Sequence, residues 1–177
     1  MDKIRLGRTG MMVARLGFGG IPIQRISEDE AVEVVRRCID LGVTFLDTAN
    51  GYTTSEERIG KAVKGRRDEV FIATKSGSRN REGLEKHLKL SLERLGTDYI
   101  DLFQFHGISD FTSLETILDP RGPMAVVEDA VDKAASCTEC GDCEEQCPYE
   151  LPIREMLAEQ VRYFQEAKER YEQRTGA

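Results

Sequence analysis

Short apolar runs alternate with helical patterns between residues 16 and 105, and this alternation restricts the chain to few fold classes. Strand-like runs occupy residues 16–19, 43–47, 70–74 and 99–105, and the segments between them carry helical periodicity. Strands separated by helices pair in parallel through right-handed crossovers. We therefore predict an α/β fold that is built on a parallel sheet.

The helices between these strands carry start and stop signals. Ser27 followed by Glu30 matches a capping box and opens a helix that stops at Gly42. Further helices are expected from residue 55 to about residue 64 and from about residue 81 to residue 95. These boundaries leave short connections, as expected for compact β/α units.

Smaller elements flank this pattern. Residues 3–6 and 12–15 are expected to form a β-hairpin before the first strand. After the last strand come a short segment at residues 113–118, a helix opened by Pro123 and a final amphipathic helix that starts at Pro152.

Composition excludes several classes of partner. The net charge is −7, with 32% charged and 40% hydrophobic residues, which is typical of a folded domain and argues against a nucleic-acid partner. No apolar run approaches the ~20 residues that span a membrane, and no secretory signal opens the sequence. We therefore expect a cytoplasmic protein with no membrane partner.

Four polar residues stand at or just beyond the ends of successive strands, namely Asp47, Tyr52, Lys75 and His106. A lysine cation beside a tyrosine makes the tyrosine a better acid, an aspartate holds the lysine, and a neutral histidine hydrogen-bonds a carbonyl oxygen. Taken singly, each residue has an ordinary explanation, such as a solvated strand end or a loop anchor. Taken together, they predict proton transfer to an oxygen as hydride arrives at carbon.

The motifs around these residues resemble those of the aldo-keto reductase family in order and spacing. They are FLDTANGY at residues 45–52, IATK at 72–75 and DYIDLFQFH at 98–106, with LGRTG at 6–10 and LGFGG at 16–20. The resemblance covers roughly residues 3–130.

The resemblance implies a fold and a site. The fold is a partial (β/α) TIM-type barrel, with about four β/α units after the N-terminal hairpin, in residues 1–136. The four strand-end residues correspond to the family's catalytic tetrad, with Tyr52 as proton donor to a small carbonyl substrate. Gly19, Gly20 and Asp47 fall where the family approaches the nicotinamide end of NADP.

A complete barrel needs eight strands, and this sequence contains four before the cysteine cluster. In the family, the second half supplies the residues that grip the pyrophosphate, 2′-phosphate and adenine of NADP. Half a barrel leaves the outer edges of its first and last strands unpaired. Either a homodimer closes the barrel, or the C-terminal segment folds across the open side.

Four of the five cysteines lie together near the C-terminus. They are Cys137, Cys140, Cys143 and Cys147, followed by Pro148. This is the run found in bacterial ferredoxins, so residues 137–177 are predicted to be a small, helical, ferredoxin-like iron–sulfur segment that binds a 4Fe–4S cluster. Zinc is the main competitor. The fourth ligand is either Cys147 or a residue of a partner, because in two-cluster ferredoxins the last cysteine of such a run serves the other cluster.

The remaining residues of this segment are acidic. Glu139, Asp142, Glu144 and Glu145 surround the cysteines, either as ordinary solvated charges or as a surface that steers a redox protein partner. The fifth cysteine, Cys38, lies on the apolar face of its helix and is predicted to pack in the core.

Two classes of function follow from these observations. The first is an aldo-keto-reductase-like oxidoreductase that carries an iron–sulfur cluster and performs NADP-linked carbonyl or alcohol chemistry. The second is a non-catalytic iron–sulfur protein for electron transfer or assembly that uses the half-barrel as a scaffold. The tetrad favours the first class, and the absent cofactor-gripping half favours the second.

Overall fold

The computed structural model describes residues 1–7, 9–145 and 152–175. The chain forms two compact units, Met1–Pro123 and Met124–Ala177. The sequence predicts a division between residues 136 and 137. The contacts within the structure instead group the helix Met124–Ala135 with the second unit.

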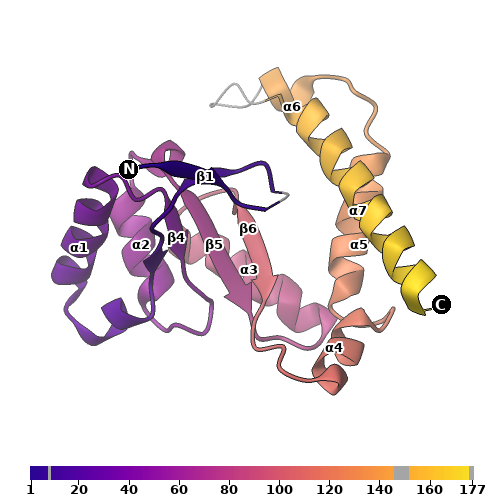
Figure 1. The fold of residues 1–177 in the computed structure, drawn as a ribbon, viewed down its shortest axis with the longest axis horizontal. Coiled ribbons are helices and arrows are strands. Elements are labelled where there is room, and N and C mark those ends of the chain that lie inside the picture. Colours follow the sequence, from indigo (N-terminus) through magenta and orange to yellow (C-terminus); the bar gives the residue numbers. More distant parts are fainter. Residues whose placement is uncertain (8, 146–151, 176–177) are drawn as a thin grey trace. The chain divides into compact units, whose positions relative to one another are not determined.

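The first unit contains a four-stranded parallel sheet (Figure 1). Its strands are β3 (Phe18–Gly19), β4 (Phe45–Asp47), β5 (Phe71–Ser76) and β6 (Leu102–Phe105), in the order β3-β4-β5-β6. The sheet order therefore follows the chain order, as the alternation of strands and helices predicts.

The predicted hairpin is present as β1 (Lys3–Arg5) and β2 (Met12–Ala14), which pair antiparallel. It lies at the end of the sheet where the parallel strands begin (Figure 1). The Ala14 amide donates to Thr44 Oγ1 at 2.8 Å, directly before β4. The hairpin thus closes the N-terminal end of the strands and leaves their C-terminal ends uncovered by it.

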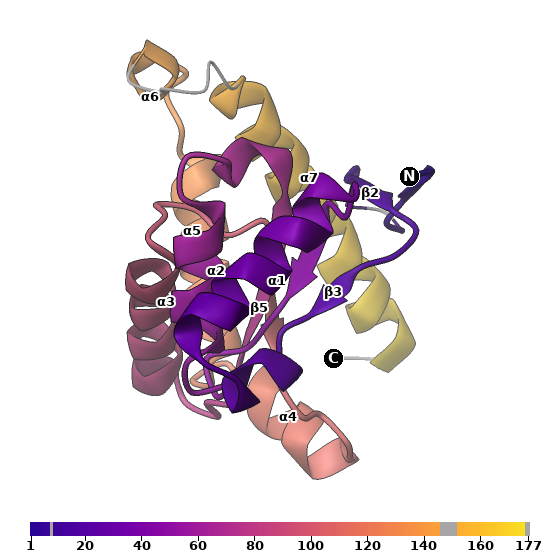
Figure 2. The same cartoon turned by 90° about the vertical axis from the view of Figure 1, so that its left-hand side faces the viewer.

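Three long helices cover one face of the sheet (Figure 2). They are α1 (Glu28–Asp40), α2 (Ser55–Val63) and α3 (Arg81–Leu95), and α4 (Phe111–Leu118) follows β6. The capping box of α1 is confirmed, because Ser27 and Glu30 exchange side-chain and backbone hydrogen bonds. The predicted bounds of α3 agree with the structure.

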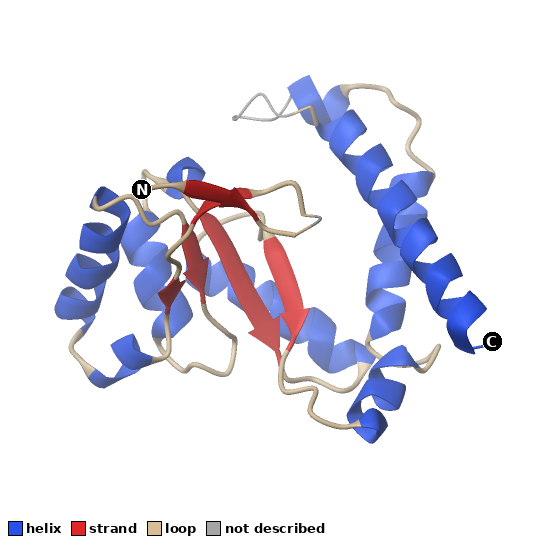
Figure 3. Cartoon of the chain, viewed as in Figure 1, coloured by secondary structure: helices blue, strands red, loops and turns tan. Residues whose placement is uncertain are grey.

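The core lies between this helical layer and the sheet (Figure 3). Leu46 of β4, Ile72 of β5 and Ile59 of α2 are fully buried. Cys38 packs against the edge of the same cluster, as its position on the apolar face of α1 predicts. Burial of this one face explains why the sheet and the helices form a single layered unit.

An ion pair braces the sheet at the end where the strands begin. Arg67 Nη2 lies 2.6 Å from Asp101 Oδ2, and both side chains are largely buried. The Arg67 guanidinium also stacks on the Tyr99 ring at 3.9 Å, and Asp101 accepts from the Ile72 amide at 2.8 Å. These contacts tie the start of β5 to the segment that leads into β6.

The second unit is helical. It contains α5 (Met124–Ala135), α6 (Asp142–Glu145) and α7 (Ile153–Thr175), and α5 packs along α7. The α7 helix begins one residue after Pro152, where the sequence predicts a helix start. An ion pair between Lys168 and Glu128, at 3.0 Å, joins the two long helices. None of the helices in the described residues is both long and apolar enough to cross a membrane.

Candidate active site

The strand-end residues predicted from the sequence all lie at the C-terminal end of the sheet. Asp47 ends β4, Lys75 is near the end of β5, and His106 directly follows β6. Backbone pairing continues past the strands, since the His106 amide donates to the Ser76 carbonyl at 2.8 Å. This continued pairing fixes the position of each residue along the strand direction relative to the residue on the neighbouring strand.

Lys75 is held by the strand next to it. Its Nζ lies 2.5 Å from Asp47 Oδ1 and 2.7 Å from the Thr48 carbonyl oxygen. The Lys75 side chain is 16% exposed and that of Asp47 is 35% exposed. The ammonium group therefore has two fixed acceptors.

Tyr52 lies in the loop between β4 and α2 and faces both Lys75 and His106. Lys75 Nζ is 5.5 Å from the centre of the Tyr52 ring. The Tyr52 and His106 rings meet edge to face, with centres 5.5 Å apart and planes at 80°. The structure thus brings the tyrosine, the lysine, the histidine and Asp47 into one group, although they come from three successive strand ends.

Gly20 packs too closely for any side chain. A Cβ there would lie 2.4 Å from Ser55 Oγ and 3.1 Å from the Asp47 carbonyl oxygen, and the Gly20 amide donates to that same carbonyl at 2.7 Å. Gly19, by contrast, is exposed and has open space where a side chain would project. At Gly19 and Gly20, therefore, no side chain covers the backbone beside Asp47.

Arg79 is a residue at the site that the sequence analysis missed. Its Nη2 donates to the carbonyl oxygens of His106 at 2.7 Å and of Gly107 at 3.0 Å, and its Nη1 donates to that of Gly77 at 3.1 Å. It therefore joins the loop after β5 to the loop after β6. An arginine directly before a helix start is too common a pattern to have signalled this role.

The cysteine segment belongs to the second unit. Cys137, Cys140 and Cys143 are free and exposed, whereas the fourth predicted ligand, Cys147, lies outside the described residues. Among the residues that the structure describes, no group of three or more His, Cys, Asp or Glu side chains is placed to hold a metal ion. The three described thiols are therefore accessible but not gathered into a site.

One arginine braces this segment against α7. Arg154 Nη2 lies 2.6 Å from Glu144 Oε2, and Arg154 Nη1 donates to the Glu139 carbonyl oxygen at 3.3 Å. Arg154 holds the pKa of the Glu144 carboxyl below its usual range, because its guanidinium and its backbone amide both donate hydrogen bonds to that carboxylate. The chain around Cys140 and Cys143 is thus attached to the first turn of α7.

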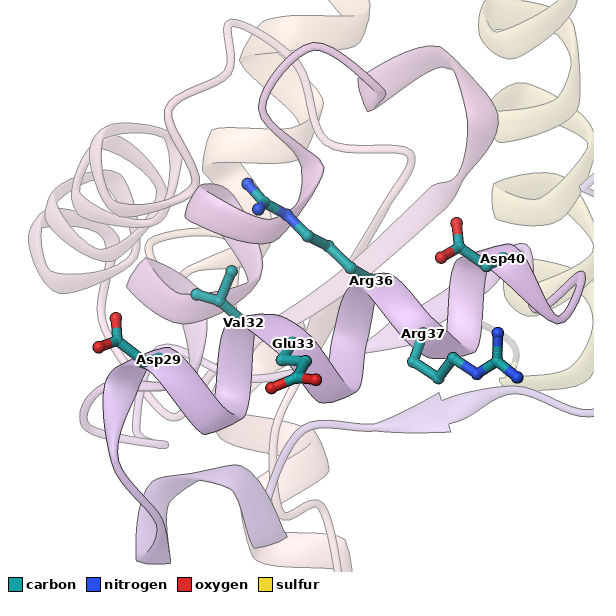
Figure 4. Close-up of a pocket in the computed structure, with 6 residues that line it drawn as sticks. All are labelled: Asp29, Val32, Glu33, Arg36, Arg37 and Asp40. Atoms are coloured by element: carbon teal, nitrogen blue, oxygen red, sulfur yellow. The ribbon is translucent and has the colours of Figure 1, made fainter.

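A shallow hollow runs along α1, away from the tetrad (Figure 4). Its lining residues are Asp29, Val32, Glu33, Arg36, Arg37 and Asp40. Arg36 points toward α2 and donates to the carbonyl oxygens of Ala62 and Lys61 at 3.3 and 3.2 Å. Because the hollow is lined by both acidic and basic side chains and Arg36 caps α2, we assign it no binding role.

Sequence comparison decides the family. A profile described as the aldo/keto reductase family matches residues 15–148. The chain belongs to this family. The matched region includes the parallel sheet and all four strand-end residues, so the first unit is a partial α/β barrel of the aldo/keto reductase type.

Individual aldo/keto reductases are similar over part of their length. L-galactose dehydrogenase of Arabidopsis thaliana is 38% identical over 142 residues, which are 70% of this chain and 44% of that protein. The thermostable aldo-keto reductase Tm1743, solved with the inhibitor epalrestat, has 33% identity and a TM-score of 0.63, with coverage of 75% and 50%. An aldo-keto reductase from Klebsiella pneumoniae in complex with NADPH has 27% identity and a TM-score of 0.57, with coverage of 71% and 46%. The chain thus spans about half the length of these relatives.

Proposed function

We propose that the chain is an NADP-linked oxidoreductase that interconverts a small carbonyl compound and its alcohol, with Tyr52 as the proton donor. The observation that carries the proposal is the position of Lys75 Nζ, which contacts Asp47 at 2.5 Å and lies 5.5 Å from the Tyr52 ring. This arrangement places a cation beside the tyrosine ring, where it can stabilise the negative charge that remains when Tyr52 gives up its proton.

Each residue has a separate part in the reduction. His106 hydrogen-bonds the carbonyl oxygen of the substrate and polarises the C=O bond. NADPH, when bound, supplies the hydride that forms the new C–H bond. Tyr52 transfers its hydroxyl proton to the oxygen as negative charge develops there, and Lys75 stabilises the resulting phenolate. Asp47 holds Lys75 in place, and the phenolate regains a proton from solvent.

The glycine pair and Asp47 are suited to the nicotinamide end of the cofactor. Gly19 presents bare backbone beside Asp47, and the crowding at Gly20 keeps that strip free of side chains. The Klebsiella relative, which was solved with NADPH, supports the same choice of cofactor. A flat ring can therefore approach the strand ends without meeting a side chain from these two positions.

The test combines binding with a point variant. NADPH fluorescence is expected to saturate on titration with protein, and Tyr52→Phe is expected to lower the rate of aldehyde reduction by about 10²–10⁴-fold with NADPH binding unchanged. Tyr163→Phe, on α7, is the matched control and should keep full activity. Absence of NADPH binding at high protein concentration, or full activity in Tyr52→Phe, would overturn the proposal.

A second part of the proposal assigns a 4Fe–4S cluster to the four clustered cysteines, Cys137, Cys140, Cys143 and Cys147. The three described thiols fit this role in chemistry, because thiolates are the usual cluster ligands and all three are exposed. Anaerobically purified protein is expected to be brown and to contain about four irons per chain, and Cys140→Ser should lose most of them. Stoichiometric zinc without iron would replace this assignment by a zinc site.

The alternative function is a non-catalytic iron–sulfur protein that passes electrons to a redox partner or serves in assembly. The observation that favours it is the exposure of the thiols beside the acidic residues Glu139 and Asp142, which are also exposed. Such a surface suits a basic partner protein. Cluster reduction without any NADPH binding would select this alternative.

We propose a homodimer as the way in which the half-barrel is completed. Within the described residues β3 and β6 are the outer strands of the sheet, each paired on one side. A two-fold axis along the barrel would pair β6 of one copy with β3 of the other in parallel, and so join two sets of four strands into eight. Sedimentation should then show a dimer, and NADPH affinity should fall on dilution below the dimer range.

A further inference from the structure

The loop that carries Tyr52 determines where the tyrosine lies relative to Lys75 and His106. Within this loop, the Tyr52 amide donates to the Ala49 carbonyl at 2.9 Å, and the Tyr52 carbonyl accepts from the Ser55 amide at 2.7 Å. Any contact that holds the loop from outside therefore also sets the position of the tyrosine ring.

Asn50 is the residue at which the loop is attached to its surroundings. Its amide donates to the Lys75 carbonyl at 2.9 Å, and its side-chain Nδ2 donates to Ser91 Oγ of α3 at 3.3 Å. Its own carbonyl oxygen accepts from Arg94 Nη1 at 3.1 Å. One residue, two positions before Tyr52, thus joins the loop to β5 and to α3.

A buried carboxylate holds Arg94 in this position. Glu56 Oε2 lies 3.3 Å from Arg94 Nη1, and the Glu56 side chain is 1% exposed. Glu56 Oε1 accepts from Thr74 Oγ1 at 2.7 Å, one residue before Lys75. A buried charge is unfavourable unless it is paired and hydrogen-bonded. The Glu56 carboxylate therefore has to keep both its ion pair with Arg94 and its hydrogen bond from Thr74.

Gly60 allows helices α2 and α3 to lie close enough for Glu56 to reach Arg94. A Cβ on Gly60 would lie 2.6 Å from the Arg94 carbonyl oxygen, so only glycine lets α2 pack this closely against the end of α3. Glu56 lies one helical turn earlier on α2. The close approach therefore brings the carboxylate of one helix to the guanidinium of the other.

We propose that Glu56 is a positioning residue for Tyr52. Its carboxylate holds Arg94 against the Asn50 carbonyl and, through Thr74, is fixed to the strand that carries Lys75. Glu56 thereby sets the distance between the tyrosine and the lysine without touching the substrate. The proposal rests on the reductase function only in its kinetic consequence.

The test uses His106 as a reporter of the Tyr52 ring. The chain has two histidines, so their ring-proton NMR signals are readily assigned, and the edge-to-face contact with Tyr52 gives His106 a ring-current shift. Glu56→Gln is expected to move the His106 signals toward their position in Tyr52→Leu. Glu57→Gln is the matched control, because Glu57 is the next residue, is 50% exposed and lies 3.8 Å from Arg94 Nε; it should leave the signals in place.

A double variant separates positioning from stability. Glu56→Gln alone leaves Arg94 without its buried counter-charge, which destabilises the fold. Glu56→Gln combined with Arg94→Met removes both charges, so the thermal midpoint is expected to recover part of the loss while the His106 signals stay displaced. Native His106 signals in this double variant, or in a folded Glu56→Gln variant, would overturn the proposal.

Kinetics give the second readout. A displaced tyrosine impairs the chemical step, so Glu56→Gln is expected to lower kcat by about 10²-fold with the NADPH dissociation constant unchanged. Equal loss of NADPH affinity would indicate general loosening and contradict positioning. If no variant, nor the parent, reduces aldehydes, the reductase proposal fails, whereas the NMR result still decides the role of Glu56.

Discussion

The two units of the chain place their reactive groups in opposite ways. In the first unit, Asp47, Lys75 and His106 lie at or next to the ends of paired strands, and Tyr52 lies in a loop that is hydrogen-bonded to β5 and α3. In the second unit, three thiols are exposed in a segment held to α7 through Arg154. The first unit therefore has an arranged set of groups without any ligand, whereas the three described thiols of the second unit are not gathered into a site.

The two units differ in this way because they bury different amounts of apolar side chain. The first unit encloses a contiguous hydrophobic cluster between α1, α2 and the sheet. In the described part of the second unit, Ala125 is the one apolar residue that is buried. A pair of helices with so small a core gains little from packing, so the cluster that we propose for the cysteines is expected to supply much of the stability of this unit.

Removal of the proposed cluster is the largest expected effect, and it tests the contrast directly. Because metal binding supplies folding free energy when the site is not preformed, anaerobic iron chelation is expected to raise hydrogen exchange throughout α7. Exchange in β4 and β5 should not change. If α7 stays protected after the iron is lost, the helices are held by their own packing, and the contrast fails.

Truncation of the core comes next. Leu46→Ala removes a fully buried side chain and is expected to lower the free energy of unfolding of the first unit by about 2–5 kcal/mol, measured by urea denaturation. Val34→Ala, at a position that is 42% exposed, is the control and should change it by less than about 0.5 kcal/mol. The iron content should be the same in both variants. A loss of iron in Leu46→Ala would show that the two units are coupled.

Loss of a helix cap has a smaller effect. Asn80 Oδ1 accepts from the Gly83 amide at 2.8 Å and so caps α3. Asn80→Ala is expected to destabilise the first unit by about 1 kcal/mol, and Asn80→Asp should restore most of that. An unchanged denaturation midpoint in Asn80→Ala would mean that the core alone fixes the start of α3.

Acid titration is the smallest and most local test. The Ser113 amide and hydroxyl bond the Asp110 carboxylate and lower the pKa of that carboxyl. Because the pKa is lower in the folded state, the cap stabilises α4 above the ordinary aspartate range and is lost as pH falls through the lowered value. The Ser113 amide NMR shift should follow this titration and become independent of pH in Asp110→Asn.

The sequence predicted the first unit well because its signals are local. Alternating strands and helices, the capping box at Ser27 and the stop signal at Gly42 each depend on a few adjacent residues, and the structure agrees with them. The four strand-end residues were chosen by motif, and the parallel register brings them together. Arg79, Glu56 and Arg94 were missed, because their partners lie 18 to 44 residues away and no local pattern marks such contacts.

The second unit was harder to predict for the same reason. The sequence indicated its cysteine run and its final helix, but the division between the units depends on how α5 packs along α7. Residues 124–136 continue directly from the half-barrel without a linker signal. Only the packing of Met124–Ala135 against a helix that begins at Ile153 assigns them to the second unit.

The ion pair at the base of the sheet has a consequence for how such a chain can change over time. Arg67 and Asp101 fix the entry to β5 and β6 at the end remote from the tetrad. Loops at the other end can then vary in length and sequence without loss of strand register. The loops that carry Tyr52 and His106 are therefore free to diverge among descendants of this sequence while β5 and β6 stay in register, so long as the buried pair is inherited intact.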